Sequence, residues 1–161
     1  MDIPSQPDKQ STANEVRNKT ILQLKQERNL HAIGVGSGMM NQIRMLALSF
    51  VYYKEIDIET AREILVSASD LFLENINSYE KIHPFLENYP FTTKNIEIAI
   101  FLLKPDGSKP SGGNLTVISI TNGILSYKTD HPDDGRLTRI YEETYEEASS
   151  KIRDARSAEN E

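Results

Sequence analysis

The chain has 161 residues, a formal net charge of −6 at pH 7 and no cysteine. This length suits one domain with one hydrophobic core. The missing thiols exclude disulfides, thiolate nucleophiles and sulfur-ligated zinc. The acidic balance argues against nucleic acid and anionic membrane surfaces as partners. No stretch reaches the ~18 consecutive apolar residues of a transmembrane helix.

The two ends of the chain are too polar to contribute to a core. Residues 1–12, MDIPSQPDKQST, predict a disordered leader or tether. A sparse apolar stripe at helical spacing then predicts a surface helix from Ala13 to about Arg28. We expect a single domain over residues 13–156 and a frayed C-terminus over 157–161.

Residues 34–44, GVGSGMMNQIR, place three glycines at alternating positions before an apolar run. Residues 39–52 are apolar around most of a helical wheel, which predicts a buried helix with Ser37 as its cap. An anion site at the start of that helix is the less favoured alternative, because the pattern departs from a dinucleotide-binding loop at Met39 and lacks the Lys-Ser/Thr pair of a P-loop. Its candidate residues are Gly34, Gly36, Ser37, Gly38 and Arg44.

The next segments predict a helix, an extended strap and a second helix. Asp57 can cap a helix whose apolar residues keep the 3.6-residue period as far as Ile76. Residues 82–91, IHPFLENYPF, contain two prolines and are expected to form an extended strap over the core. Apolar spacing and a run of glutamates predict a C-terminal helix over residues 137–152.

Three strands are predicted between the strap and that last helix: NIEIAIFLL, LTVISIT and ILSYK. The Asn122-Gly123 pair is a strong hairpin signal and sets Thr121 opposite Ile124. Keeping apolar residues on one face then sets Ile98 opposite Ile120. The expected fold class is α+β, an antiparallel three-stranded meander packed against three to four helices. A short fourth strand near residues 30–35 is a possible addition to this sheet.

The face of the meander turned away from the helices is expected to be apolar at one end. Either the C-terminal helix or the strap covers that end, or it is a surface for self-association or a protein partner. The sequence leaves these two interpretations open. The residues concerned are Phe101, Leu103, Leu115 and Val117.

Side chains with catalytic or metal-binding chemistry do not form a recognisable set. DHPDDG, residues 130–135, holds three carboxylates and an imidazole, but its spacing is not that of a calcium loop and suits a turn with helix-capping residues. His31 and His83 have no partner at a recognisable spacing, and no nucleophile elbow or HExxH motif occurs. We therefore expect no catalytic residue, no metal and no cofactor.

Four stretches carry a resemblance to a known group of proteins: MLALSF, AREILV, YPFTTKNIEIAIF and NGILSY. They resemble parts of small uncharacterised bacterial proteins described as lipoproteins. The resemblance implies that the polar leader follows a lipidated cysteine, which would tether the domain on the periplasmic side of a bacterial cell envelope. It implies no activity and no site residue.

The expected function is a non-enzymatic interaction or adaptor domain, with a protein partner or self-association. A small acidic cytosolic protein similar to secretion chaperones is the alternative, and it should form a dimer around a sheet. An enzyme or binder of an anionic small molecule at the glycines is the third hypothesis.

Overall fold

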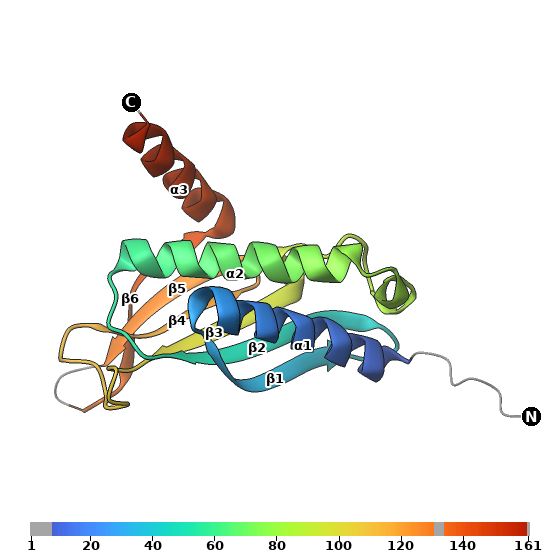
Figure 1. The fold of residues 1–161 in the computed structure, drawn as a ribbon, viewed down its shortest axis with the longest axis horizontal. Helices are drawn as coiled ribbons and strands as arrows, with labels where there is room; N and C mark the ends of the chain where they lie inside the picture. Colours follow the sequence, from blue (N-terminus) through green and yellow to red (C-terminus); the bar gives the residue numbers. More distant parts are fainter. Residues whose placement is uncertain (1–7, 131–133, 161) are drawn as a thin grey trace, which may run out of the picture.

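The computed structural model describes residues 8–130 and 134–160. These residues form a mixed six-stranded sheet in the order β1-β2-β3-β4-β5-β6, with three α-helices against it (Figure 1). The α+β class is confirmed, and the three-stranded meander is wrong. No helix in the described ranges is long and apolar enough to cross a membrane. The elements are β1 His31–Met39, β2 Ile43–Tyr52, β3 Ile96–Leu102, β4 Leu115–Thr121, β5 Ile124–Asp130, β6 Leu137–Thr144, α1 Lys9–Arg28, α2 Ile58–Ser78 and α3 Tyr145–Glu159.

One parallel pair makes the sheet mixed. β2 and β3 run parallel, and every other neighbouring pair is antiparallel. Parallel strands need a long crossover connection, and α2 supplies most of it. Two short 3₁₀ helices, Glu80–Phe85 and Thr93–Asn95, complete the return to the sheet. α1 and α2 lie side by side on one face, whereas α3 projects away beyond α2 (Figure 1).

The buried helix predicted over residues 39–52 is instead strand β2. Leu46, Leu48 and Phe50 alternate with half-buried residues and are themselves fully buried beneath the helices. The run is apolar at nearly every position, so it satisfies a helical period and a strand period equally well. Its place between two neighbouring strands decides the outcome, because a central strand is covered on both edges.

The predicted α2 helix and the predicted hairpin are confirmed. The Asp57 carboxylate accepts a hydrogen bond from the Thr60 backbone N–H and caps α2. Asn122 and Gly123 both have positive φ, as a two-residue hairpin turn requires. The predicted pairs Thr121 with Ile124 and Ile98 with Ile120 are those of the sheet.

The strap expected over residues 82–91 is partly 3₁₀ helix rather than extended chain. Three of its side chains still enter the core, namely Ile82, Leu86 and Phe91. Leu86 also pairs with Ile43 at the start of β2 in an isolated bridge. This segment therefore closes one end of the sheet.

The C-terminal helix lies about eight residues later in the chain than predicted and has almost the predicted length. Residues 137–144 form edge strand β6, and the helix begins only at Tyr145, after Thr144 caps it by accepting a hydrogen bond from the Glu147 backbone N–H. Residues 157–159, expected to be frayed, are the last residues of α3. At the other end, α1 begins at Lys9 with Asp8 as its cap, so the described part of the expected leader belongs to the helix.

Candidate functional site

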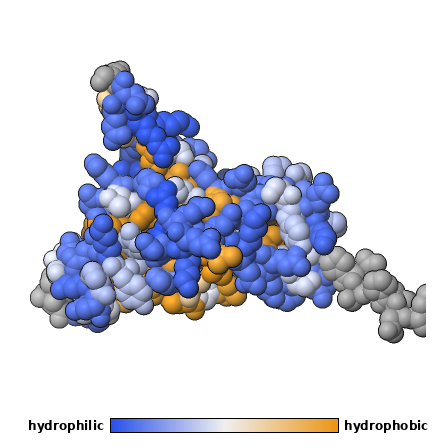
Figure 2. All heavy atoms as spheres, in the orientation of Figure 1, coloured by the Kyte–Doolittle hydropathy of each residue, from blue (hydrophilic) through white to orange (hydrophobic). Residues whose placement is uncertain are grey.

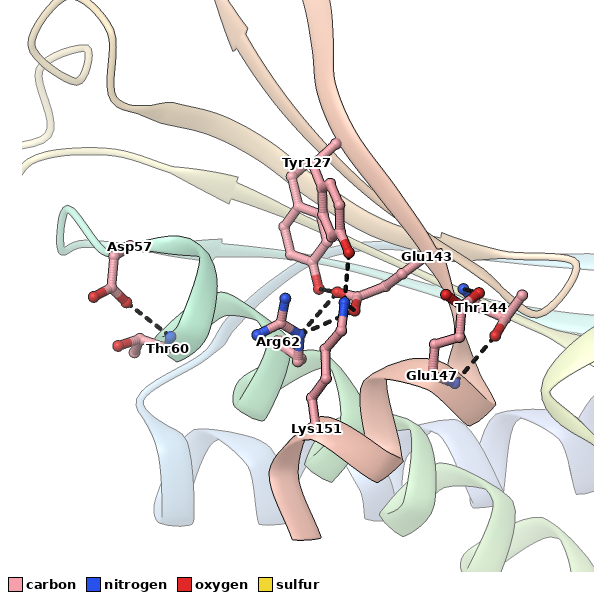
Figure 3. Close-up of polar contacts among 9 residues, drawn as sticks. Asp57, Thr60, Arg62, Tyr127, Glu143, Thr144, Glu147 and Lys151 are labelled. Carbon is pink, nitrogen blue, oxygen red and sulfur yellow. Dashed lines mark hydrogen bonds and ion pairs between the residues drawn. The ribbon is translucent and has the colours of Figure 1, made fainter. Parts of the chain in front are cut away.

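A buried carboxylate lies where α2, β5, β6 and α3 meet (Figure 3). The side chain of Glu143 is fully buried. It accepts hydrogen bonds from Tyr127 Oη at 2.6 Å, from Arg62 Nε at 2.9 Å and from Lys151 Nζ at 2.9 Å. Each donor comes from a different element, so the carboxylate ties α2 and α3 to the β6 edge of the sheet.

The charges of this cluster keep each group in its usual protonation state. Burial alone raises the pKa of Glu143, but hydrogen bonds from Tyr127, Lys151 and Arg62 outweigh it and hold the pKa below its ordinary value. Burial and the bond to Glu143 raise the pKa of Tyr127. Neither group is poised to exchange a proton near neutral pH. The geometry suits a structural clamp better than an acid–base centre.

Sequence reasoning missed this clamp because it placed Glu143 on a solvated helix face. In β6, strand alternation turns Glu143 inward, opposite the buried Leu125. Glu142, its neighbour, points outward and pairs with Arg139 at 2.8 Å. The sequence of residues 137–144, LTRIYEET, has no apolar alternation that would have indicated a strand.

The glycines of the predicted anion site lie in strand β1, and no helix begins beside them. The helix N-terminus that was to attract an anion is therefore missing from the described structure at this position. Gly34, Gly36 and Gly38 have no positive φ, so their backbone does not require glycine. The structure brings only Gly38 and Arg44 together, because a side chain at Gly38 would meet the Arg44 guanidinium at 3.4 Å.

Ser37 takes part in a different interaction, with a buried arginine of α1. Arg17 Nη1 donates to the Gly36 carbonyl oxygen at 2.8 Å and to Ser37 Oγ at 2.5 Å. Arg17 Nη2 donates to Asn14 Oδ1 at 2.6 Å, and Nε has no partner. Arg17 is only 2% exposed, and no carboxylate in the described ranges forms an ion pair with it. Its contacts tie α1 to β1.

The outer edge of β1 has no strand partner among the described residues, because β1 is nine residues long and pairs only with β2. Two irregularities of register, between Ala32 and Gly34 and between Gly38 and Met39, interrupt the strand. It contains no Lys, Arg, Asp, Glu or Pro, the residues that natural proteins use to blunt an edge. We call the outer side of His31–Met39 the β1 edge.

Apolar side chains accompany this edge. Ile33 and Val35 of β1 are 58% and 55% exposed, and Leu22 on α1 is 56% exposed. Figure 2 shows apolar atoms gathered along the side of the molecule where Figure 1 draws β1 and α1. We call Ile33 and Val35 the apolar strip; Leu22 lies on a side of α1 that no described contact joins to β1. An unprotected strand edge next to exposed apolar side chains is a typical interaction surface.

The four residues predicted as an interaction surface do not form one. Phe101 pairs with Val117 on the sheet face opposite the helices, where Phe101 is exposed and Val117 is nearly buried. A bulge between Leu115 and Val117 turns Leu115 to the other face, into the core. Leu103 follows the end of β3 and is half-buried. The bulge is the physical reason that the sequence pattern misplaced Leu115.

The DHPDDG segment is only partly described, since residues 131–133 lie outside the described ranges. Within those ranges, no group of three or more His, Cys, Asp or Glu side chains is arranged to hold a metal ion.

Comparison of the chain with protein-family models, curated proteins and solved structures finds no match. The resemblance to bacterial lipoproteins therefore rests on the quoted sequence stretches alone.

Proposed function

We propose that this protein is a non-enzymatic interaction domain whose binding site is the β1 edge. An extended segment of a partner adds to β1 as a further strand and makes main-chain hydrogen bonds, while the apolar strip contacts its side chains. The single observation that carries this proposal is the edge strand β1, which has no Lys, Arg, Asp or Glu and exposes the apolar side chains of Ile33 and Val35.

The opposite edge of the sheet offers a contrast. β6 also exposes apolar side chains, with Leu137 and Ile140 each 50% exposed. It carries Arg139 and Glu142 in an ion pair, and α3 continues directly from its end. Charged side chains on an edge strand oppose pairing with another strand. The β1 edge is therefore the better surface for strand addition.

The Glu143 clamp supports the non-enzymatic part of the proposal. Its carboxylate already accepts bonds from three donors, and its acidic groups titrate away from neutral pH. A catalytic acid or base works best when its pKa lies near the operating pH.

The proposal is tested by site-specific photo-crosslinking in cells that express the protein. A photoreactive amino acid at Val35 should give a discrete covalent adduct. The same amino acid at Ile140, which is similarly exposed on the β6 edge, is the matched control and should give none. Equal adducts from both positions, or none from Val35, would refute the β1 edge as the binding site.

A further inference from the structure

We propose that the cavity between α1 and the C-terminal end of α2 binds a small zwitterion, an amino acid with an apolar side chain. This site is separate from the β1 edge, so the inference goes beyond the proposed function and does not depend on it. The two helices lie side by side (Figure 1), and the cavity between them has a volume of about 270 Å³. A cavity of about 150 Å³ already holds benzene, so this one has room for a larger molecule. The lining residues that carry the argument are Glu15, Val16, Lys19, Asn75 and Tyr79.

Asn75 gives the cavity an acceptor group of fixed orientation. The residue is 5% exposed, and its Nδ2 donates to Thr20 Oγ1 at 2.9 Å and to Gln23 Oε1 at 2.8 Å. Thr20 Oγ1 has to be the acceptor of the first bond, because its single hydrogen is donated to the Val16 carbonyl oxygen at 2.9 Å. The Asn75 amide therefore cannot turn round, and its Oδ1 is the polar atom left for the cavity.

This Oδ1 atom has no partner in the protein. No group of the described residues donates a hydrogen bond to it. The side-chain atoms of the described ranges that are enclosed without a partner are Arg17 Nε and Ser69 Oγ. Asn75 Oδ1 is not one of them, so it is accessible from outside, and the cavity that Asn75 lines is the route to it. A nearly buried carbonyl oxygen without a partner requires a hydrogen-bond donor from a bound molecule.

Glu15 and Lys19 place opposite charges beside the same cavity. They are four residues apart on α1, a spacing at which Glu and Lys commonly form an ion pair. Among the described residues no ion pair joins them. Tyr79 Oη instead donates a hydrogen bond to the Glu15 carboxylate. The Lys19 ammonium and the second Glu15 oxygen are both left to bind a ligand.

These groups match the two ends of an amino acid. The ammonium group of the ligand donates to the Glu15 carboxylate and to Asn75 Oδ1, since it has three hydrogens to donate. The carboxylate of the ligand pairs with the Lys19 ammonium. Val16, which is 3% exposed, and the Tyr79 ring supply apolar surface for the ligand's side chain. A ligand with one charge alone leaves Glu15 or Lys19 without its partner.

Isothermal titration calorimetry with L-leucine as the probe tests the proposal. Leucine should bind saturably to the wild-type protein. Isoamylamine, which lacks the carboxylate, and isocaproate, which lacks the ammonium, should each bind about tenfold more weakly or worse, because each loses a hydrogen bond between charged groups.

Two charge-removing substitutions locate the site. Glu15→Gln and Lys19→Gln should each weaken leucine binding about tenfold. Glu27→Gln and Lys25→Gln are the matched controls, because they make the same changes at exposed positions of α1 that do not line the cavity. Both controls should bind leucine as the wild type does. All four positions are exposed, so thermal melts of the four variants should match the wild type.

Three results would overturn the inference. They are the absence of saturable leucine binding, binding of isoamylamine or isocaproate as tight as that of leucine, and an equal loss of affinity in the cavity variants and their controls. None of these results bears on the β1 edge, which the photo-crosslinking at Val35 tests separately.

Discussion

Arg17 has a buried positive charge whose two Nη atoms donate to three neutral acceptors in place of a carboxylate, while Nε has no partner among the described residues. Burial lowers the pKa of Arg17, but a guanidinium stays protonated in proteins. Its long stem also fills space between α1 and the sheet, since it is among the largest fully buried side chains. Packing and hydrogen bonding therefore both contribute to its stabilising effect, and two substitutions separate them.

We expect Arg17→Ala to lower the free energy of unfolding by about 2–4 kcal/mol, because it empties a buried volume next to β1. Arg17→Met should recover most of this loss, since its side chain fills the stem volume without a buried charge. Urea denaturation of both variants measures the difference. If Arg17→Met is as destabilised as Arg17→Ala, the hydrogen bonds to Gly36, Ser37 and Asn14 are the dominant contribution.

The Glu143 carboxylate should make stability depend on acid pH. Its pKa is lowered in the folded state, so its contribution is present above the ordinary carboxyl value of 4.5 and is lost as pH falls through the lowered pKa. Glu143→Gln should reduce stability near neutral pH by about 2–4 kcal/mol, because Arg62 and Lys151 lose their charged acceptor.

The wild-type and Glu143→Gln curves of unfolding free energy against pH should converge below pH 4. Glu142→Gln is the matched control, because Glu142 forms an exposed pair with Arg139, and surface pairs contribute about 0–1 kcal/mol. A constant gap between wild type and Glu143→Gln down to low pH would show that the carboxylate charge is not what stabilises the clamp.

At the level of elements, the sequence predicts those whose apolar period is unambiguous. α2 has one buried and one solvated face, and buried residues recur at every second position of β3, so each pattern fits one kind of element. β4 and β5 are identified by the Asn122-Gly123 turn between them. β2 is apolar on both faces and fits two periods. Residues 137–152 contain the end-to-end elements β6 and α3. The apolar residues of the two elements together have the spacing of a single helix. Local periodicity cannot resolve these cases, because pairing with distant strands decides them.

Helix α3 is attached to the domain only through its first half. Ala148 is fully buried and Tyr145 and Ile152 are half-buried, whereas residues 153–160 are all exposed. Removing residues 154–161 should therefore change the melting temperature by less than about 2 °C. Ala148→Asp should instead cost about 3 kcal/mol, because it buries a charge without a partner.

Circular dichroism melts distinguish these two changes of α3. Ser157→Asp, at an exposed position of the same helix, is the control for the added charge. A large loss of stability on truncation would mean that the projecting half of α3 also packs against the domain.

At the level of the whole molecule, the helices cover one face and leave one uncharged edge. α1 lies over β1 and β2, α2 over β3 to β5, and α3 beside β6, so the described helices all contact the same side of the sheet. The α+β class and the hairpin register follow from the sequence. The number of strands does not follow from the sequence, because β2 and β6 were both predicted to be helical. The β1 edge was missed for the same reason. With β2 predicted as a helix, the glycine-rich strand had no partner strand and was not recognised as the edge of a sheet.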